Sequence, residues 1–384
     1  MTPKVEFITD ATRFAAVGSA WQSPWQRAGG RIFQRHDWLS GWLEGVQDRR
    51  EIRPYMVLAW DGPVLVGALP CAVHRRSGVR LLQWAAQVFS DYCDVLIDPA
   101  HPDILPVLWE AMWRCGGFDL VSLQQVRPDA SCRAFLDRLA AEGPLHPGER
   151  TERCMRIENR WPNGEAFFRS LNKKGRNNHT RGKRILGELG GEVTFRVIEP
   201  NAAAEPGSAE PERAEPVLAE LVRLKDVWLR ANDPASPLLG ADAAVLRTVL
   251  RRAWDTGLAK IFLLEVGGRI AAASVNFVYD GRMEAYFTAY DAAYERASPG
   301  TILIVDYAKW SFDRSLTMVD FLRGDEGFKF RLANAETMLD SYAGSRTLMG
   351  QVAISGHRWL SRLRQKPEAV TAAPPAAEEL EAAE

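Results

Sequence analysis

The chain has 384 residues, of which 46% are hydrophobic and 25% charged, a composition typical of a folded protein with a substantial core. Its 48 Lys and Arg nearly balance its 49 Asp and Glu, and a net charge of -1 excludes a general attraction to nucleic acid or anionic lipid. No apolar run approaches the roughly 18 residues that span a bilayer, and the first residues lack a secretory-signal pattern. We therefore expect a cytoplasmic protein.

Metal and disulfide chemistry have no support in the sequence. The five cysteines are scattered without a C-x-x-C pair, and the six histidines include no H-x-x-x-H pair. We therefore expect neither a disulfide framework nor a metal site.

The first part of the chain contains a legible succession of elements. Apolar residues at helical spacing predict a helix over 38–46, and two apolar runs around an Asp-Gly turn predict a hairpin over 55–70. A helix over 104–115 and a buried strand over 118–124 follow. This order predicts an α/β unit.

A dense basic stretch then occupies residues 171–184. Its cationic residues are Lys173, Lys174, Arg176, Arg181, Lys183 and Arg184. No aromatic residue interleaves with them and no nucleic-acid motif accompanies them, so we expect no nucleic-acid partner. A solvated helix face and a docking surface for an anionic cofactor or substrate both fit this pattern.

The second part of the chain repeats the order of the first. A segment rich in Ala, Pro and Glu over 200–216 predicts a disordered insertion, and a helix over 217–231 carries an apolar stripe that we assign to the core. A hairpin over 261–276 turns at Gly-Gly, and a helix over 300–313 and a strand over 317–322 come later. Two similar α/β halves therefore follow one another.

Residues 282–291 form a strand with period-two alternation. Met283, Ala285, Phe287 and Ala289 are expected on one face, and Glu284, Tyr286, Thr288 and Tyr290 on the other. The second face predicts the wall of a cleft, although an ordinary sheet with a solvated face fits as well.

A helix start follows at Ser298-Pro-Gly-Thr301. Ser298 suits the N-cap and Pro the first helical position, while Gly300 leaves the first turn bare. The free N–H groups of this first turn, as far as Thr301, would bind a phosphate group well. Helix capping alone also explains the Ser-Pro sequence.

A polar turn follows the strand that ends near residue 322. Asp325, Glu326 and Lys329 lie just beyond that strand end, where α/β sheets commonly bind ligands. A carboxylate there can take a proton from an ammonium nucleophile, and the lysine can balance negative charge. A solvated ion-paired turn is the alternative.

The end of the chain, residues 351–384, reads as a basic segment followed by a disordered acidic tail. Arg358, Arg362 and Arg364 predict either a basic amphipathic helix on the surface or an anion site. The R-x-x-x-R pair resembles the arginine motif with which PilZ-type domains hold cyclic di-GMP. Contact with lipid headgroups, which implies peripheral membrane association, is a further alternative.

Four segments together resemble the FemAB-like, CelD-type branch of the GNAT acyltransferase superfamily. They are residues 90–94, the basic helix from Leu171, the 298–301 helix start, and the 320–329 turn. The resemblance implies an α/β (α+β) fold of two tandem GNAT-like domains, each a mixed, mainly antiparallel sheet flanked by helices. We place the domains at 1–160 and 161–350.

The resemblance also implies acyl transfer from acetyl-CoA or another acyl-CoA to an amine. The acceptor expected from this branch is an amino sugar of bacterial exopolysaccharide or holdfast material, either small or lipid-linked. Asp325 or Glu326 is then the base, Lys329 neutralises an anion, and Tyr286 or Tyr290 contacts the acceptor or the leaving thiolate. Ser298, Gly300 and Thr301 bind the donor. The alternatives are a long-chain acyltransferase acting on a lipid amine, as in ceramide synthesis, and a non-catalytic protein that responds to cyclic di-GMP.

Overall fold

The computed structural model describes residues 3–148, 152–200, 214–324 except 235, 237 and 239, and 326–355. Within these ranges no helix is both long and apolar enough to cross a membrane. The predicted insertion at 200–216 lies mostly outside them, but residues 214–216 form the first turn of a helix, so the prediction is wrong there. Asp325, Arg358, Arg362 and Arg364 also lie outside the described residues.

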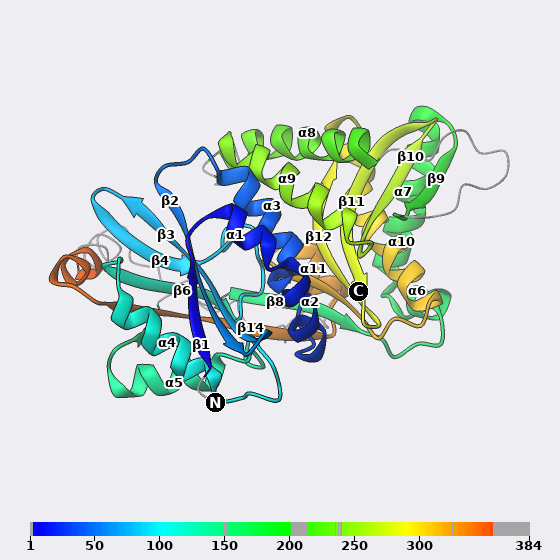
Figure 1. Ribbon diagram of the computed structural model, residues 1–384. Coiled ribbons are helices and arrows are strands. Elements are labelled where there is room, and N and C mark those ends of the chain that lie inside the picture. Colours follow the sequence, from blue (N-terminus) through cyan, green and yellow to red (C-terminus); the bar gives the residue numbers. More distant parts are fainter. Residues whose placement is uncertain are drawn as a thin grey trace, which may run out of the picture.

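The amino-terminal half forms one side of a large sheet (Figure 1). Its strands are β1 (Lys4–Ile8), β2 (Ile52–Asp61), β3 (Val64–Arg76), β4 (Val79–Trp84), β5 (Leu96–Ile97), β6 (Leu120–Val126) and β7 (His146–Pro147). Its helices are α1 (Ala11–Ala16), α2 (Gly18–Arg27), α3 (His36–Val46), α4 (Ile104–Cys115) and α5 (Arg133–Glu142), with the 3-10 turn η1 (Ile32–Gln34). The predicted hairpin is β2–β3, paired antiparallel.

The carboxy-terminal half continues the same sheet. Its strands are β8 (Glu152–Glu158), β9 (Val193–Ile198), β10 (Ala259–Val266), β11 (Arg269–Tyr279), β12 (Arg282–Tyr290), β13 (Met318–Arg323) and β14 (Ala335–Ser345). Its helices are α6 (Gly164–Ser170), α7 (Lys173–Gly190), α8 (Ala214–Asn232), α9 (Ala241–Asp255), α10 (Pro299–Asp313) and α11 (Gly327–Leu332), with the 3-10 turn η2 (Ala292–Ala297).

The described residues form one sheet in the order β1-β2-β3-β4-β6-β14-β8-β13-β12-β11-β10-β9, with β5 and β7 at its sides. Neighbouring strands are antiparallel except for β4–β6 and β12–β13. The predicted mixed, mainly antiparallel α/β fold is therefore confirmed. β14 joins the halves because it pairs with β6 on one side and β8 on the other. The sheet shows no break at residue 160, and the domain division stays a prediction.

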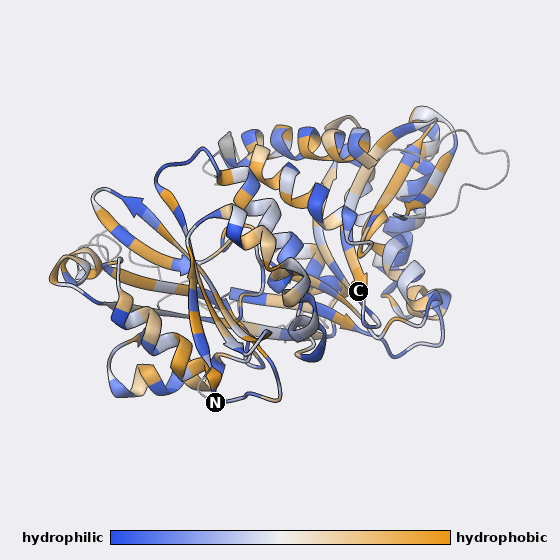
Figure 2. Cartoon of the chain, viewed as in Figure 1, coloured by the Kyte–Doolittle hydropathy of each residue, from blue (hydrophilic) through white to orange (hydrophobic). Residues whose placement is uncertain are grey.

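A shared apolar core also holds the halves together. Trp38 of α3 is fully buried, and its ring lies 5.6 Å from that of Phe277 on β11. Helix α3 packs closely on α9, since a Cβ on Gly41 or Gly45 would lie 3.0 or 2.9 Å from backbone atoms of Val249 or Val245. Figure 2 shows hydrophobic residues along the central strands and alternating hydrophilic residues on outer helices such as α8. This packing gives residues from both halves fixed positions around one site.

Candidate active site

The site begins where two parallel strands part. β12 and β13 pair only over residues 282–284 and 318–320. Beyond these, β13 stays with β8 and β12 stays with β11. Within the described ranges, the edge of β12 that faces β13 has no strand partner over residues 285–290. A wedge therefore opens between the strands, and its backbone N–H and C=O groups are available to a ligand.

A bulge in β12 overturns part of the predicted side-chain pattern. Phe287 is opposite Val275 and Ala285 is opposite Asn276, so Tyr286 is an extra residue. Because the bulge reverses the alternation, Ala285 packs in the cluster around α10, whereas Phe287 packs in the cluster that contains α8. The prediction that Met283, Ala285, Phe287 and Ala289 share one face is therefore wrong.

The wedge contains a cavity of about 280 Å³, which we call the wedge cavity. Of the predicted site residues it is lined by Tyr286, Tyr290, Gly300, Thr301, Glu326 and Lys329. The structure thus brings together segments that are up to 43 positions apart, from Tyr286 to Lys329. Aromatic and apolar walls come from Trp228, Phe287, Ile304, Tyr307, Phe321 and Phe328.

Glu326 and Lys329 form an ion pair at the mouth of this cavity. Glu326 Oε2 lies 2.9 Å from Lys329 Nζ, which also donates to the carbonyl of Arg323. Lys329 is buried, whereas the Glu326 side chain is 55% exposed. Gly324 makes room for the pair, because a Cβ there would lie 2.3 Å from Glu326 Oε2. A carboxylate paired with a buried lysine therefore lies within reach of a substrate.

Lys225 of α8 also lines the wedge cavity and was missed in the sequence, where only the apolar stripe of this helix was considered. Its Nζ lies 4.7 Å from the centre of the Trp228 ring and 5.6 Å from that of Phe287. Burial lowers the pKa of Lys225, and the nearby charge of Lys329 lowers it further, against the opposing effect of Glu326. An amine with a depressed pKa in a cavity is a common feature of functional sites.

The hydroxyl groups of Tyr286 and Tyr290 differ in how free they are to contact a substrate. Tyr286 donates its hydroxyl proton to the carbonyl of Phe89 at 2.7 Å, and burial raises the pKa of Tyr286 well above its usual value. Its proton is therefore already used by the amino-terminal half. Tyr290 is half-buried beside Gly300, where an added Cβ would lie 3.4 Å from the Tyr290 ring.

Arg323 links the wedge cavity to the other half. Its Nε donates to Asp91 at 2.6 Å and its Nη1 donates to Glu152 at 3.0 Å. Burial raises the pKa of Asp91, although the charge of Arg323 opposes this. The 90–94 segment that contributed to the family resemblance therefore lies against the site.

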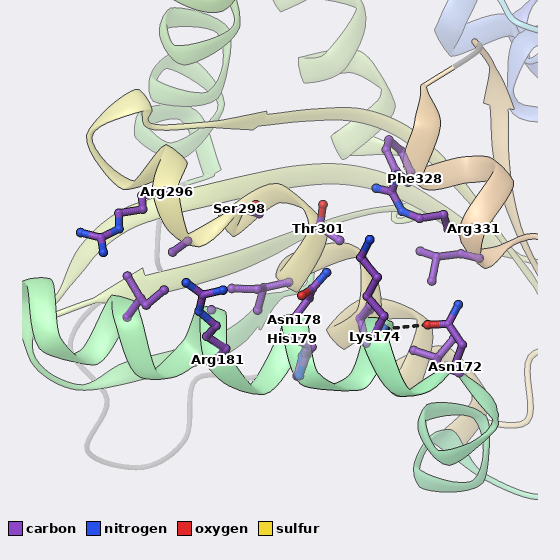
Figure 3. A pocket seen from close by; sticks show the side chains of 18 residues that line it. Asn172, Lys174, Asn178, His179, Arg181, Arg296, Ser298, Thr301, Phe328 and Arg331 are labelled. Carbon is purple, nitrogen blue, oxygen red and sulfur yellow. Dashed lines mark hydrogen bonds between the residues drawn. The ribbon is translucent and has the colours of Figure 1, made fainter. Parts of the chain in front are cut away.

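A second, larger space adjoins the first along α7. It is a groove of about 460 Å³ between α7, η2 and the first turns of α10, and it shares Thr301 and Phe328 with the wedge cavity (Figure 3). Its cationic lining residues are Lys174, Arg181, Arg296 and Arg331. None of these four has an ion-pair partner in the part of the chain that the structure describes. We call this space the basic groove.

The predicted basic stretch therefore contributes to a binding surface, through Lys174 and Arg181. Arg296 and Arg331 were missed because each is a single arginine in a short surface segment, with no local pattern to mark it.

His179 forms part of the floor of the basic groove. Its Nε2 lies 2.8 Å from Asp306 Oδ1, and Lys183 Nζ lies 2.8 Å from Asp306 Oδ2. Burial alone would raise the pKa of Asp306, but the hydrogen bond from His179 and the charge of Lys183 outweigh it and lower the pKa. The buried pair of His179 and Asp306, with the partly exposed Lys183, fixes α7 on α10.

The start of α10 lies between the two spaces. Ser298 occupies the N-cap position with a φ of 55°, but its side chain makes no capping hydrogen bond, unlike the sequence prediction. The N–H groups of Thr301 and Ile302 both donate to the carbonyl of Ser298. Pro299 has no N–H, which leaves Gly300 as the residue of the first turn whose N–H faces the wedge cavity without a backbone partner among the described residues.

Comparison with known proteins agrees with this geometry. Residues 173–330 match a family model described as an acetyltransferase (GNAT) domain. The whole fold is similar to the crystal structure of FemX, with a TM-score of 0.55 and 10% identity over 88% of this chain and 96% of that one. It is also similar to the C-terminal domain of a putative lysylphosphatidylglycerol synthetase from Agrobacterium fabrum, with a TM-score of 0.51 and 12% identity over 90% and 97% of the two chains.

A search among curated protein sequences finds no match. The FemX likeness agrees with a FemAB-like fold, whereas the CelD-type branch stays a prediction. The matched residues 173–330 contain the whole lining of the wedge cavity and most of the basic groove, whose Leu171, Asn172, Arg331 and Leu332 lie outside the match. Such a domain implies acyl-CoA as co-substrate. Residues 173–330 thus resemble a GNAT acetyltransferase domain, which supports the GNAT-type acyltransferase that the sequence predicts.

Proposed function

We propose that this protein transfers an acyl group from coenzyme A to an amine. The observation that carries the proposal is the continuous path from the basic groove, past the start of α10, into the wedge between β12 and β13. Four cations at one end suit the phosphates of the donor, and an unpaired strand edge suits the amides of its arm.

The donor is held by this chain's own groups. Lys174, Arg181, Arg296 and Arg331 bind phosphate oxygens in the basic groove. The N–H of Gly300 and the edge of β12 bind the polar groups of the arm. The acyl thioester then lies in the wedge cavity, between the aromatic walls.

The reaction centre in this proposal is formed by Glu326, Lys225 and Tyr290. Glu326 accepts a proton from the acceptor ammonium, directly or through water, and its ion pair with Lys329 holds the carboxylate in position. The free amine attacks the thioester carbonyl, and Lys225 stabilises the resulting oxyanion. The C–S bond then breaks, and the second proton of the attacking nitrogen passes to the thiolate through Tyr290 or water, which leaves a neutral amide and free CoA. Tyr286 positions the wall of the cavity through its bond to Phe89.

The acceptor that we propose is an amino sugar of a bacterial polysaccharide, as the CelD-type resemblance implies. A lipid amine stays the alternative acceptor. The predicted cyclic di-GMP role depends on Arg358, Arg362 and Arg364, which lie outside the described residues, and it stays a prediction.

A thiol-release assay with acetyl-CoA tests this function. Glucosamine should release free CoA, whereas glucose, which lacks the amine, should not. Glu326→Gln should reduce turnover by roughly 100-fold or more, because general base catalysis is typically worth 10²–10⁴. Glu188→Gln is the matched control, since Glu188 lies on the exposed side of α7 and pairs with Arg184.

Three results would contradict parts of the proposal. If no amine, including a sphingoid-type base, releases CoA, the proposed transfer reaction is wrong. If only the lipid amine releases CoA, the acceptor is a lipid amine and not an amino sugar. Full activity in Glu326→Gln would remove Glu326 as the base.

A further inference from the structure

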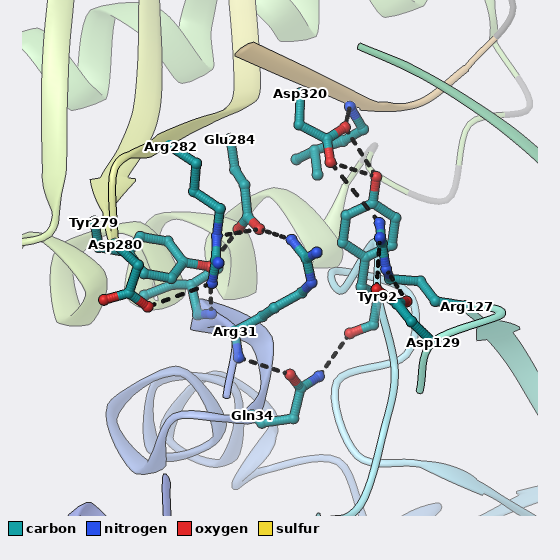
Figure 4. A network of polar contacts seen from close by, with 12 residues as sticks. Arg31, Gln34, Tyr92, Arg127, Asp129, Tyr279, Asp280, Arg282, Glu284 and Asp320 are labelled. Atoms are coloured by element: carbon teal, nitrogen blue, oxygen red, sulfur yellow. Dashed lines mark hydrogen bonds and ion pairs between the residues drawn. The ribbon is translucent and has the colours of Figure 1, made fainter. Parts of the chain in front are cut away.

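A third cavity lies at the seam between the two halves, away from the proposed donor path. It has a volume of about 220 Å³ and shares no lining residue with the basic groove or the wedge cavity. Its walls come from the turn after α2, the segments 92–96 and 127–131, and the first residue of β12. We call it the arginine cavity, because Arg31, Arg127 and Arg282 converge on it (Figure 4).

Buried carboxylates hold these arginines from outside the cavity. Arg31 pairs with Glu284, which is completely buried, and Arg282 Nε lies 3.7 Å from the same carboxylate. Arg127 Nη1 lies 3.9 Å from Asp320, whose side chain is 2% exposed. Neither carboxylate lines the cavity. Arg31 and Arg282 therefore have a counter-ion that does not line the cavity, while Arg127 lies between Asp320 behind it and Asp129 on the cavity wall.

The ring of Tyr92 brings two of the arginines together. The guanidinium carbons of Arg31 and Arg127 lie 4.9 and 4.6 Å from its centre. Tyr92 itself is anchored, because its hydroxyl donates to both oxygens of Asp320 at 2.9 and 2.8 Å. Burial, the largest influence, and the charge of Arg31 act to lower the pKa of Arg127, but the hydrogen bond to Asp129 together with the charges of Tyr92 and Asp129 raises it. Two cations that repel one another thus face the same small space.

Some N–H groups of these arginines have no hydrogen-bond partner in the described part of the chain. Among the described residues the guanidinium group of Arg31 makes a hydrogen bond through Nη1 alone. Nε and Nη2 of Arg282 are buried and have no hydrogen-bond partner there, and its ion-pair distances to Asp280 and Glu284 are 3.6 and 3.7 Å. An acceptor group that entered the cavity would let these guanidinium groups complete their hydrogen bonds.

Two carboxylates line the cavity, and neither closes it to an anion. Asp94 is occupied by the N–H groups of Val95, Ser131 and Cys132, at 2.7–3.0 Å. Asp129 is 66% exposed and forms two hydrogen bonds with Arg127. Among the lining residues three arginines thus face two carboxylates, while Glu284 and Asp320 lie behind the arginines as further counter-ions.

We propose that the arginine cavity binds an oxyanion, either the phosphate or the carboxylate group of a small ligand. Planar guanidinium groups bind both by paired hydrogen bonds. A volume of about 220 Å³ is below the roughly 300–1,000 Å³ that hold drug-sized ligands, so the site takes one anionic head group. The proposal does not depend on the acyltransferase function.

The test is calorimetric titration of the protein with inorganic phosphate and, separately, with succinate, at constant ionic strength. Phosphate also suits the basic groove, so all proteins compared carry Arg181→Gln and Arg296→Gln. Arg127→Gln in this background should weaken binding about tenfold or more, because a hydrogen bond to a charged group contributes roughly 1.5–3 kcal/mol. Asp129→Asn should strengthen binding a few-fold, because it removes a competing carboxylate and frees Arg127.

The second variant keeps the test decisive if Arg127→Gln fails to fold, since Asp129 is exposed and its replacement conserves shape. The ion that binds more tightly identifies the head group. Binding of neither ion to the parent protein overturns the proposal. Affinities that are unchanged in Asp129→Asn and in folded Arg127→Gln also overturn it.

Discussion

His74 on β3 should make the stability of this protein depend on pH. Its side chain is 7% exposed, and its Nε2 has no hydrogen-bond partner among the described residues. Burial lowers the pKa of His74 from 6.5 to about 4, with a smaller contribution from Arg76. The imidazole is therefore neutral in the folded protein at pH 7, while it gains a proton on unfolding below about pH 6.5.

The sign and size follow from proton linkage. Because the folded-state pKa is depressed, the unfolded chain binds the extra proton, and stability falls as pH decreases from 6.5 toward 4. A shift from 6.5 to about 4 corresponds to about 3 kcal/mol in total, of which about 2 kcal/mol is lost by pH 5.

Chemical denaturation at pH 7 and pH 5 measures this loss. The His74→Leu variant should lose about 2 kcal/mol less than the unmodified protein between these two pH values. His146→Gln is the control, because His146 is exposed on β7 and its replacement should leave the pH dependence unchanged. Equal pH dependence in His74→Leu and the unmodified protein would refute the reasoning.

Three substitutions test other parts of the structure. Gly45→Val should lower the free energy of unfolding by about 1–3 kcal/mol in denaturant titrations, because its Cβ would lie 2.9 Å from the Val245 backbone. Gly324→Ala should reduce turnover in the thiol-release assay while circular dichroism stays unchanged, because the added carbon displaces Glu326 and the φ of 121° disfavours a side chain. Tyr286→Phe should cost about 1 kcal/mol of stability but retain turnover, since its hydroxyl is bonded to backbone.

Local patterns predicted the elements well. The hairpins, the 104–115 helix and the start of α10 depend on turn residues and apolar spacing that neighbouring residues determine. The basic stretch and the polar turn with Glu326 and Lys329 also lie at the candidate site, because charge density and position after a buried strand are visible in the sequence.

Features that arise from long-range pairing could not be predicted. The bulge at Tyr286 depends on the register between β12 and β11, and nothing in the strand itself marks it. Lys225 lies beside an apolar helical stripe as a single lysine, and only the packing of α8 over β12 shows that it lines the wedge cavity. The arginine cavity combines residues from positions 31, 127 and 282, which no local pattern connects.

The most direct measurement for the acyltransferase account is calorimetric titration with coenzyme A of two variants on the same helix. Arg181 lines the basic groove, whereas Arg184 pairs with Glu188 at 2.7 Å and does not line it. Arg181→Gln should weaken binding about 10- to 100-fold, since a charge-assisted hydrogen bond is worth roughly 1.5–3 kcal/mol. Arg184→Gln should bind as the unmodified protein does. Equal affinity in the two variants, or no binding by the unmodified protein, would contradict the proposed donor site.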